Sequence, residues 1–121
     1  MSTWVTSTLV FVRDVDASIR FYVDKLGFTL NMRFEDEGRA LVAGVSHGDG
    51  CALLLTSQWP DRVGFGIIYA AFGPEEFDAL RADLESKHVA VKEGWWGKQM
   101  LIVEDCDGNQ IFFAHPKRLG E

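Results

Sequence analysis

Residues 104–113 read Glu-Asp-Cys-Asp-Gly-Asn-Gln-Ile-Phe-Phe, and this stretch decides how the last part of the chain folds. Asp107-Gly108-Asn109 predicts a tight turn, because glycine accepts a positive φ and Asx side chains bond nearby backbone groups. The apolar run 100–103 before the turn and the run 110–114 after it are typical of strands. The stretch therefore predicts a β-hairpin.

Two amphipathic helices are predicted upstream of this hairpin. In the first, Asp14 is the expected N-cap and Gly27 the expected stop, and the apolar residues between them recur at helical spacing: Val15, Ile19, Tyr22, Val23 and Leu26. In the second, Gly73-Pro74 opens the helix, and the apolar stripe consists of Phe77, Leu80 and Leu84.

The remaining apolar, β-branched runs predict strands at 5–12, 28–35, 39–45, 51–56, 65–72 and 89–93. Each half of the chain then has the order strand, helix, three strands, and the helix starts at Asp14 and Gly73 lie 59 residues apart. This repetition predicts one α+β domain over residues 1–121, built from two βαβββ modules at 1–58 and 63–121. Gly94-Trp95-Trp96-Gly97 is predicted to be a loop.

Composition narrows the function classes. The chain has 121 residues and a net charge of −6, which disfavours a general nucleic-acid partner because such proteins carry a basic face. Residues 1–4 lack a signal-peptide pattern, and no apolar run approaches the roughly 20 residues that span a bilayer. We expect no membrane partner and a cytoplasmic protein with Cys51 and Cys106 reduced.

Two motifs resemble one known family. The string from Phe11 to Tyr22, followed by Leu26-Gly27-Phe28, is similar to its usual opening, "V-x-D-x-x-x-S-x-x-F-Y" and then "L-G-F". The hairpin at 105–112 is similar to its ending, "D-P-D-G-N-x-I-E". This is the vicinal oxygen chelate superfamily, which holds glyoxalase I, the extradiol dioxygenases and the bleomycin-resistance proteins. The resemblance implies a cup-like half-barrel and a homodimer.

In the family's metal enzymes, up to four ligands lie on the inner face of the cup. The resemblance carries these positions to Ser7, Leu54, Tyr69 and Phe112, with Thr56 as the second position if the register differs. None of these is the imidazole, carboxylate or thiolate that a catalytic divalent ion needs. We therefore expect no metal and no other cofactor, and His47, His88 and His115 are too scattered to form a shared site.

Apolar and aromatic side chains at these positions predict a small-molecule site in place of a metal site. Trp96-Gly97-Lys98 is similar to the "P-W-G-R" segment of bleomycin-resistance proteins, whose tryptophan contributes to the drug groove. The expected ligand-binding residues are Trp96, Phe112, Tyr69, Phe34, Met32, Leu54, Ser7 and Trp95. Asp36 and Glu37 are positioned to attract a cationic group. The predicted function is sequestration of an aromatic or cationic antibiotic-like compound in a hydrophobic groove.

Three alternatives stay open. The first is that residues such as Phe112 and Met32 only complete a core. The second is an atypical lyase, isomerase or dioxygenase-like enzyme that acts on a small hydrophobic substrate. In that enzyme Tyr69 or Glu104 would serve as acid or base, but no catalytic residue is assigned because the sequence shows no perturbed pKa. The third is a ligand-sensing or accessory subunit.

Overall fold

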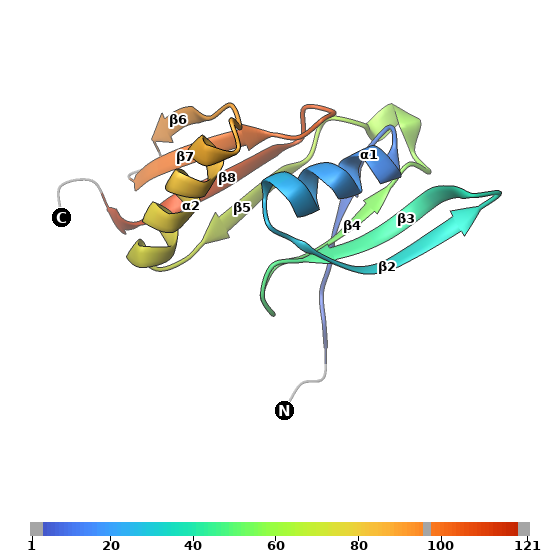
Figure 1. Ribbon diagram of the computed structural model, residues 1–121, viewed down its shortest axis with the longest axis horizontal. Helices are drawn as coiled ribbons and strands as arrows, with labels where there is room; N and C mark the ends of the chain where they lie inside the picture. The colour runs from blue at the N-terminus through green and yellow to red at the C-terminus, as the bar shows by residue number, and fades with distance from the viewer. Residues whose placement is uncertain (1–3, 96–97, 119–121) are drawn as a thin grey trace. The chain divides into compact units, whose positions relative to one another are not determined.

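The computed structural model describes residues 4–95 and 98–118, so Trp96 lies outside the described residues. The chain divides into two compact units, Met1–Gly64 and Phe65–Glu121. Each unit holds one four-stranded sheet and its helices (Figure 1). No helix in the described ranges is both long and apolar enough to cross a bilayer.

The first unit begins with a strand and a helix and continues with three strands. The elements are β1 (Thr8–Phe11), α1 (Val15–Arg20), the π-helical turn η1 (Phe21–Lys25), β2 (Thr29–Asp36), β3 (Arg39–Ser46), β4 (Ala52–Thr56) and the 3-10 turn η2 (Pro60–Arg62). The strand order is β1-β4-β3-β2, with β1 parallel to β4 and the other pairs antiparallel.

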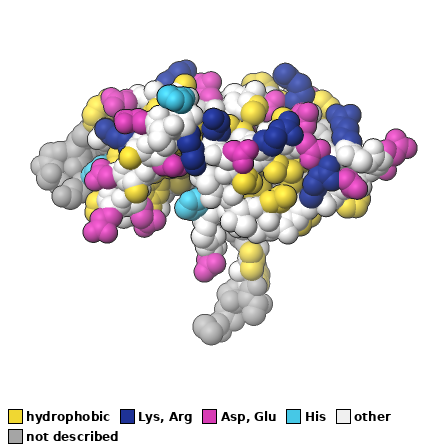
Figure 2. Space-filling model, in the orientation of Figure 1, with side chains coloured by type: hydrophobic (Ala, Val, Ile, Leu, Met, Phe, Trp, Pro, Cys, Tyr) yellow, Lys and Arg dark blue, Asp and Glu magenta, His cyan; other side chains and the backbone are white. Residues whose placement is uncertain are grey.

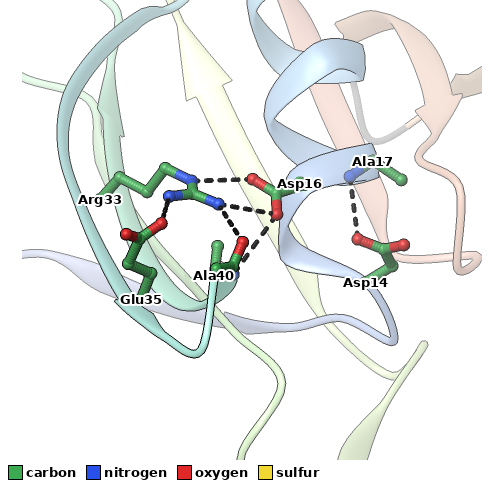
Figure 3. Close-up of polar contacts among 7 residues, drawn as sticks. Asp14, Asp16, Ala17, Arg33, Glu35 and Ala40 are labelled. Atoms are coloured by element: carbon green, nitrogen blue, oxygen red, sulfur yellow. Dashed lines mark hydrogen bonds and ion pairs between the residues drawn. The ribbon is translucent and has the colours of Figure 1, made fainter.

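The helix α1 starts where the sequence predicts. The Oδ1 atom of Asp14 accepts a hydrogen bond from the backbone N–H of Ala17 at 3.1 Å, which satisfies a donor of the first turn (Figure 3). Gly27 ends the segment with φ 76°. The last predicted turn is π-helical. The helical segment buries Val15 and Tyr22, and the sheet contributes other fully buried side chains to the core: Val10, Ala43, Val45, Leu53 and Leu55.

The second unit repeats this order. Its elements are β5 (Ile67–Ala71), α2 (Pro74–Ser86), β6 (Lys92–Trp95), β7 (Lys98–Glu104) and β8 (Gln110–Arg118). The strand order β5-β8-β7-β6 matches that of the first sheet, with β5 parallel to β8 and the other pairs antiparallel.

An aromatic cluster joins α2 to its sheet. The ring centroid of Phe72 lies 6.0 Å from the ring centroid of Phe77 on α2 and 6.1 Å from that of Phe113 on β8. His115 contacts the Phe77 ring edge-on at 4.8 Å, and the Arg81 guanidinium lies over the same ring at 5.4 Å. The side chains of Phe77 and Phe113 therefore mark the sheet face that α2 covers.

The α+β class and the two βαβββ modules are confirmed. The predicted loop at 94–97 is wrong for Gly94 and Trp95, which lie in β6. Their residue partners on β7 are Met100 and Gln99, and this ladder outweighs the low strand propensity of glycine. The sixth strand accordingly begins at Lys92, three residues later than predicted, and β1 begins at Thr8 instead of Val5.

Candidate functional site

Each sheet has one face covered by its helix and one face without a helix. In the first unit, successive side chains of each strand point to opposite faces of the sheet. Those that do not point into the buried core lie together on the other face. We call this surface the first open face. The register arranges it in two rows across β1, β4, β3 and β2: Phe11, Thr56, Val42 and Phe34 in one, and Leu9, Leu54, Gly44 and Met32 in the other.

The first open face is apolar and partly exposed. The exposed fractions are 44% for Leu9, 46% for Met32 and 58% for Phe34, values unusual for large apolar side chains in a sheet. Gly44 lies in the middle of this face. A Cβ atom at Gly44 would lie 3.1 Å from Cγ of Met32 and 3.7 Å from Cδ2 of Leu54. The side chains of Met32 and Leu54 therefore close over the glycine from the two neighbouring strands.

Polar groups border this apolar surface. The side-chain amide of Asn31 donates a hydrogen bond to Oγ of Ser46 at 2.8 Å. At the other end, Oγ1 of Thr56 accepts a hydrogen bond from the backbone N–H of Gln58 at 3.3 Å. An apolar centre with a few polar groups at its edge is the usual composition of a small-molecule site.

An aromatic and cationic cluster lies at the Thr56 end of the first open face. The rings of Phe11 and Trp59 meet edge-to-face, with centroids 5.6 Å apart and an interplanar angle of 81°. The Arg62 guanidinium lies over the Phe11 ring, 5.6 Å from its centroid. No local sequence pattern marks this cluster, because its members come from β1 and from the segment after β4.

The second unit has a comparable surface, which we call the second open face. Its register places Tyr69, Phe112, Ile102 and Lys92 in one row, and Ala71, Ala114, Met100 and Gly94 in the next. Met100, Phe112 and Ala114 form a buried apolar cluster, with Ile102 packed against it. Tyr69 is 48% exposed and Ile67 is 61% exposed, so the β5 edge of this face is the accessible part.

Gly94 occupies the same kind of position as Gly44. A Cβ atom at Gly94 would lie 2.9 Å from Cδ1 of Ile102 and 3.6 Å from Cε of Met100. Beside this row, Nζ of Lys92 pairs with Oε1 of Glu104 at 3.1 Å, which adds a charged border. A lone glycine at a strand position often marks close approach of another group, and this sequence signal applies to Gly44, which lies in the predicted strand 39–45.

The predicted site residues divide between several places. Met32, Phe34 and Leu54 share the first open face, and Tyr69 and Phe112 are direct partners on the second. Ser7 is exposed and lies just before β1. Trp95 is 57% exposed, but alternation along β6 puts its side chain on the opposite face from Gly94, Tyr69 and Phe112. The position of Trp96 lies outside the described residues.

The residues at the family's metal positions do not fit a metal ion. Leu54 and Phe112 have no donor atom, and Ser7 and Tyr69 offer only hydroxyl groups. Within residues 4–95 and 98–118, no three His, Cys, Asp or Glu side chains are grouped so as to hold an ion. We therefore derive no chemistry that passes through a metal at this site.

The charged network of the first unit lies on the helix-covered side. The Arg33 guanidinium bonds both carboxylate oxygens of Asp16 on α1, at 2.9 and 3.1 Å, and also contacts Glu35 (Figure 3). The hydrogen bond from Arg33 lowers the pKa of Asp16, and the backbone N–H of Ala40 contributes in the same direction. This network fixes α1 against the β2–β3 hairpin and takes no part in either open face.

The charged side chains on the surface are mixed in sign. In the view of Figure 2, Lys and Arg side chains are intermingled with Asp and Glu and form no continuous basic surface.

Cys51 and Cys106 are both free thiols, and burial raises the pKa of Cys51. A raised thiol pKa disfavours the thiolate, so Cys51 is a poor candidate nucleophile.

Comparison with solved structures supports the fold. A lactoylglutathione lyase from Agrobacterium tumefaciens superposes with a TM-score of 0.74 at 19% identity, over 93% of each chain. TnmS3, an antibiotic binding protein from Streptomyces sp. CB03234, gives a TM-score of 0.69 at 24% identity, over 97% of this chain and 100% of TnmS3. A glyoxalase/bleomycin resistance protein from the same Streptomyces gives 0.70 at 26% identity, over 90% of this chain and 99% of its own.

Comparison with sequence families gives a direct assignment. No curated protein matches this chain. The family model described as Glyoxalase/Bleomycin resistance protein/Dioxygenase superfamily matches residues 4–113, which is most of the chain. The two modules, their strand order and the motifs at both ends agree with that match, and the chain therefore belongs to the glyoxalase/bleomycin resistance protein/dioxygenase superfamily.

Proposed function

We propose that this protein binds a small aromatic antibiotic-like compound in a hydrophobic groove and sequesters it without altering it. The observation that carries the proposal is the first open face. The large apolar side chains of Phe34, Met32 and Leu9 are roughly half exposed on this face. A contiguous exposed apolar patch with a polar rim marks an interaction site or a ligand-binding groove.

The remaining predicted contacts belong to the same proposal. On the second open face, Tyr69 offers an exposed ring beside Phe112, which suits stacking on a planar ligand. Trp96 enters only through its similarity to the tryptophan of bleomycin-resistance proteins. Two solved proteins with this fold are TnmS3, an antibiotic binding protein, and a glyoxalase/bleomycin resistance protein. Both similarities are low, so they support the fold and suggest the ligand class.

The experiment is a titration of the purified protein with a panel of planar aromatic antibiotics, followed by calorimetry and by intrinsic tryptophan fluorescence. Phe34→Ala should weaken binding about tenfold, because a buried aromatic contact is worth about 1 kcal/mol beyond its area. The matched control is Val91→Ala, an exposed apolar residue on neither open face, which should bind like the wild type. Equal binding by both variants would overturn the proposal.

Mass spectrometry of the recovered ligand separates sequestration from catalysis. Sequestration predicts that the compound returns with unchanged mass after prolonged incubation. A new product would favour the atypical lyase, isomerase or dioxygenase-like enzyme and would redirect the search to Tyr69 and Glu104.

The homodimer implied by the family resemblance and the cytoplasmic location expected from the sequence are part of this proposal, as is the expectation that neither nucleic acid nor membrane is a partner. Light scattering coupled to size-exclusion chromatography tests the dimer directly, because its mass should be twice 13.6 kDa. A monomer at all concentrations would remove that part of the proposal and leave the ligand site intact.

A further inference from the structure

We propose that the Arg62 guanidinium anchors a carboxylate on the ligand, so that the preferred compounds are planar aromatic acids. The inference rests on the proposed function, because it names the chemistry of the ligand held on the first open face. Its basis is the cluster of Phe11, Trp59 and Arg62 at one end of that face. An Arg62 anchor requires an anionic group on the ligand, whereas the acidic residues Asp36 and Glu37 in the sequence suggest a cationic one.

The position of Arg62 is fixed by local backbone geometry. Residues 60–62 form η2, with proline at its first position. The backbone N–H of Arg62 bonds the carbonyl of Trp59 at 3.0 Å, and the N–H of Val63 bonds the carbonyl of Pro60 at 3.4 Å. Proline limits the freedom of this turn. The two side chains that contact Phe11 therefore come from a constrained segment.

The guanidinium keeps its hydrogen-bonding capacity. None of the four ion pairs among the described side chains involves Arg62, and Asp61 beside it does not pair with it. The Cζ atom of Arg62 lies 5.6 Å from the Phe11 centroid, and the N–H donors of a guanidinium lie in its plane. Arg62 can thus keep its contact with Phe11 and still donate two parallel hydrogen bonds to a carboxylate.

The rest of the first open face suits the other end of such a molecule. Phe11 is the register partner of Thr56 and begins the row that ends at Phe34. A flat aromatic body lying along this row would contact Val42 and Phe34, and its acidic group would reach Arg62. Exposed charge pairs are weak, so we expect the anchor to set selectivity more than total affinity.

The test compares two probes with the same ring system, one with a charged and one with a neutral group: anthraquinone-2-carboxylate and anthraquinone-2-carboxamide. Calorimetry on the wild type should give about tenfold tighter binding of the carboxylate, in line with a hydrogen bond to a charged group. Arg62→Met should abolish this preference and leave carboxamide binding unchanged. Arg62→Lys should restore only part of it, because lysine keeps the charge and loses the planar fork.

The matched control is Arg20→Met. Arg20 is also exposed, but it lies on α1, on the helix-covered side, so this variant changes the net charge equally without touching the cluster. It should keep the full carboxylate preference. If it loses the preference as Arg62→Met does, the effect comes from net charge, and the inference is overturned.

The outcomes separate this inference from the proposed function. If both probes bind equally and Phe34→Ala weakens both, the binding face stands and the Arg62 anchor is wrong. If neither probe binds the wild type, both ideas are overturned. If the carboxylate is preferred and only the Arg62 variants change that preference, both are supported.

Discussion

Asp105 and Asn109 hold each other across the turn between β7 and β8. Oδ1 of Asp105 accepts hydrogen bonds from the backbone N–H groups of Asp107 and Asn109, at 2.9 and 3.0 Å, and its Oδ2 accepts from the Asn109 amide at 3.0 Å. The side-chain oxygen of Asn109, Oδ1, accepts a hydrogen bond from the backbone N–H of Gly66 at 2.8 Å. The turn motif therefore ties the start of β5 to the β7–β8 hairpin.

The first prediction concerns Asn109, which is fully buried. Asn109→Ala removes the partner of the Gly66 N–H and one partner of the Asp105 carboxylate, and leaves both partly unsatisfied. We expect the free energy of unfolding to fall by about 2–4 kcal/mol, measured by urea denaturation. Asn31→Ala, which removes one exposed hydrogen bond, should cost less than about 1 kcal/mol. Similar losses for the two would contradict this account.

The second prediction concerns Gly44 in the first open face. Gly44→Ala places a Cβ atom 3.1 Å from Cγ of Met32, a side chain that is exposed and flexible enough to move. We expect little loss of stability but about fivefold weaker binding of a planar ligand, because the displaced Met32 side chain changes the shape of the binding face. The control is Gly50→Ala, where nothing lies within 4 Å of the new atom. Calorimetry showing equal affinity for both variants would refute the role of Gly44.

The third prediction uses the Asp16–Arg33 pair. The folded-state pKa of Asp16 lies below its usual value near 3.8, chiefly because of the hydrogen bond from Arg33. The unfolded chain therefore binds the proton more tightly. The stabilisation is complete above the unfolded pKa and is lost as the pH falls through the folded one.

Asp16→Asn should accordingly be less stable than the wild type at neutral pH, with the difference shrinking below about pH 4. Thermal melts from pH 7 to acid measure it. Arg33→Met should remove the same acid-dependent component, and the double variant should show no further loss of it. A constant gap between Asp16→Asn and the wild type at every pH would contradict the assignment.

The fourth prediction separates the two faces of the second sheet. Tyr69→Ala removes an exposed ring from the second open face and should weaken ligand binding about fivefold, as loss of one aromatic contact does. Trp95→Ala removes a larger and equally exposed ring from the opposite face, so binding should change less than about twofold. Stronger weakening by Trp95→Ala would place the ligand on the helix-covered side.

Local rules were enough for the parts of the fold that depend on neighbouring residues. Asp14 caps α1 through its carboxylate, and Gly27 ends the helical segment because the lack of a Cβ atom allows its positive φ. The turn at 107–109 also follows from its own residues. Pairing between strands decided the element boundaries that were wrongly predicted. Gly94 and Trp95 belong to β6 because they pair with β7. A pair of tryptophans between glycines gives no local sign of that partner.

The sequence by itself determined the α+β class and the two modules, because periodicity, caps and motif spacing are properties of the chain. Only the tertiary structure decided which side chains share a face. Strand register puts Met32 and Leu54 around Gly44 and separates Trp95 from Tyr69, and a shift of one residue would reverse both relations. The path of the chain after β4 brings Arg62 over Phe11 from a segment distant in sequence.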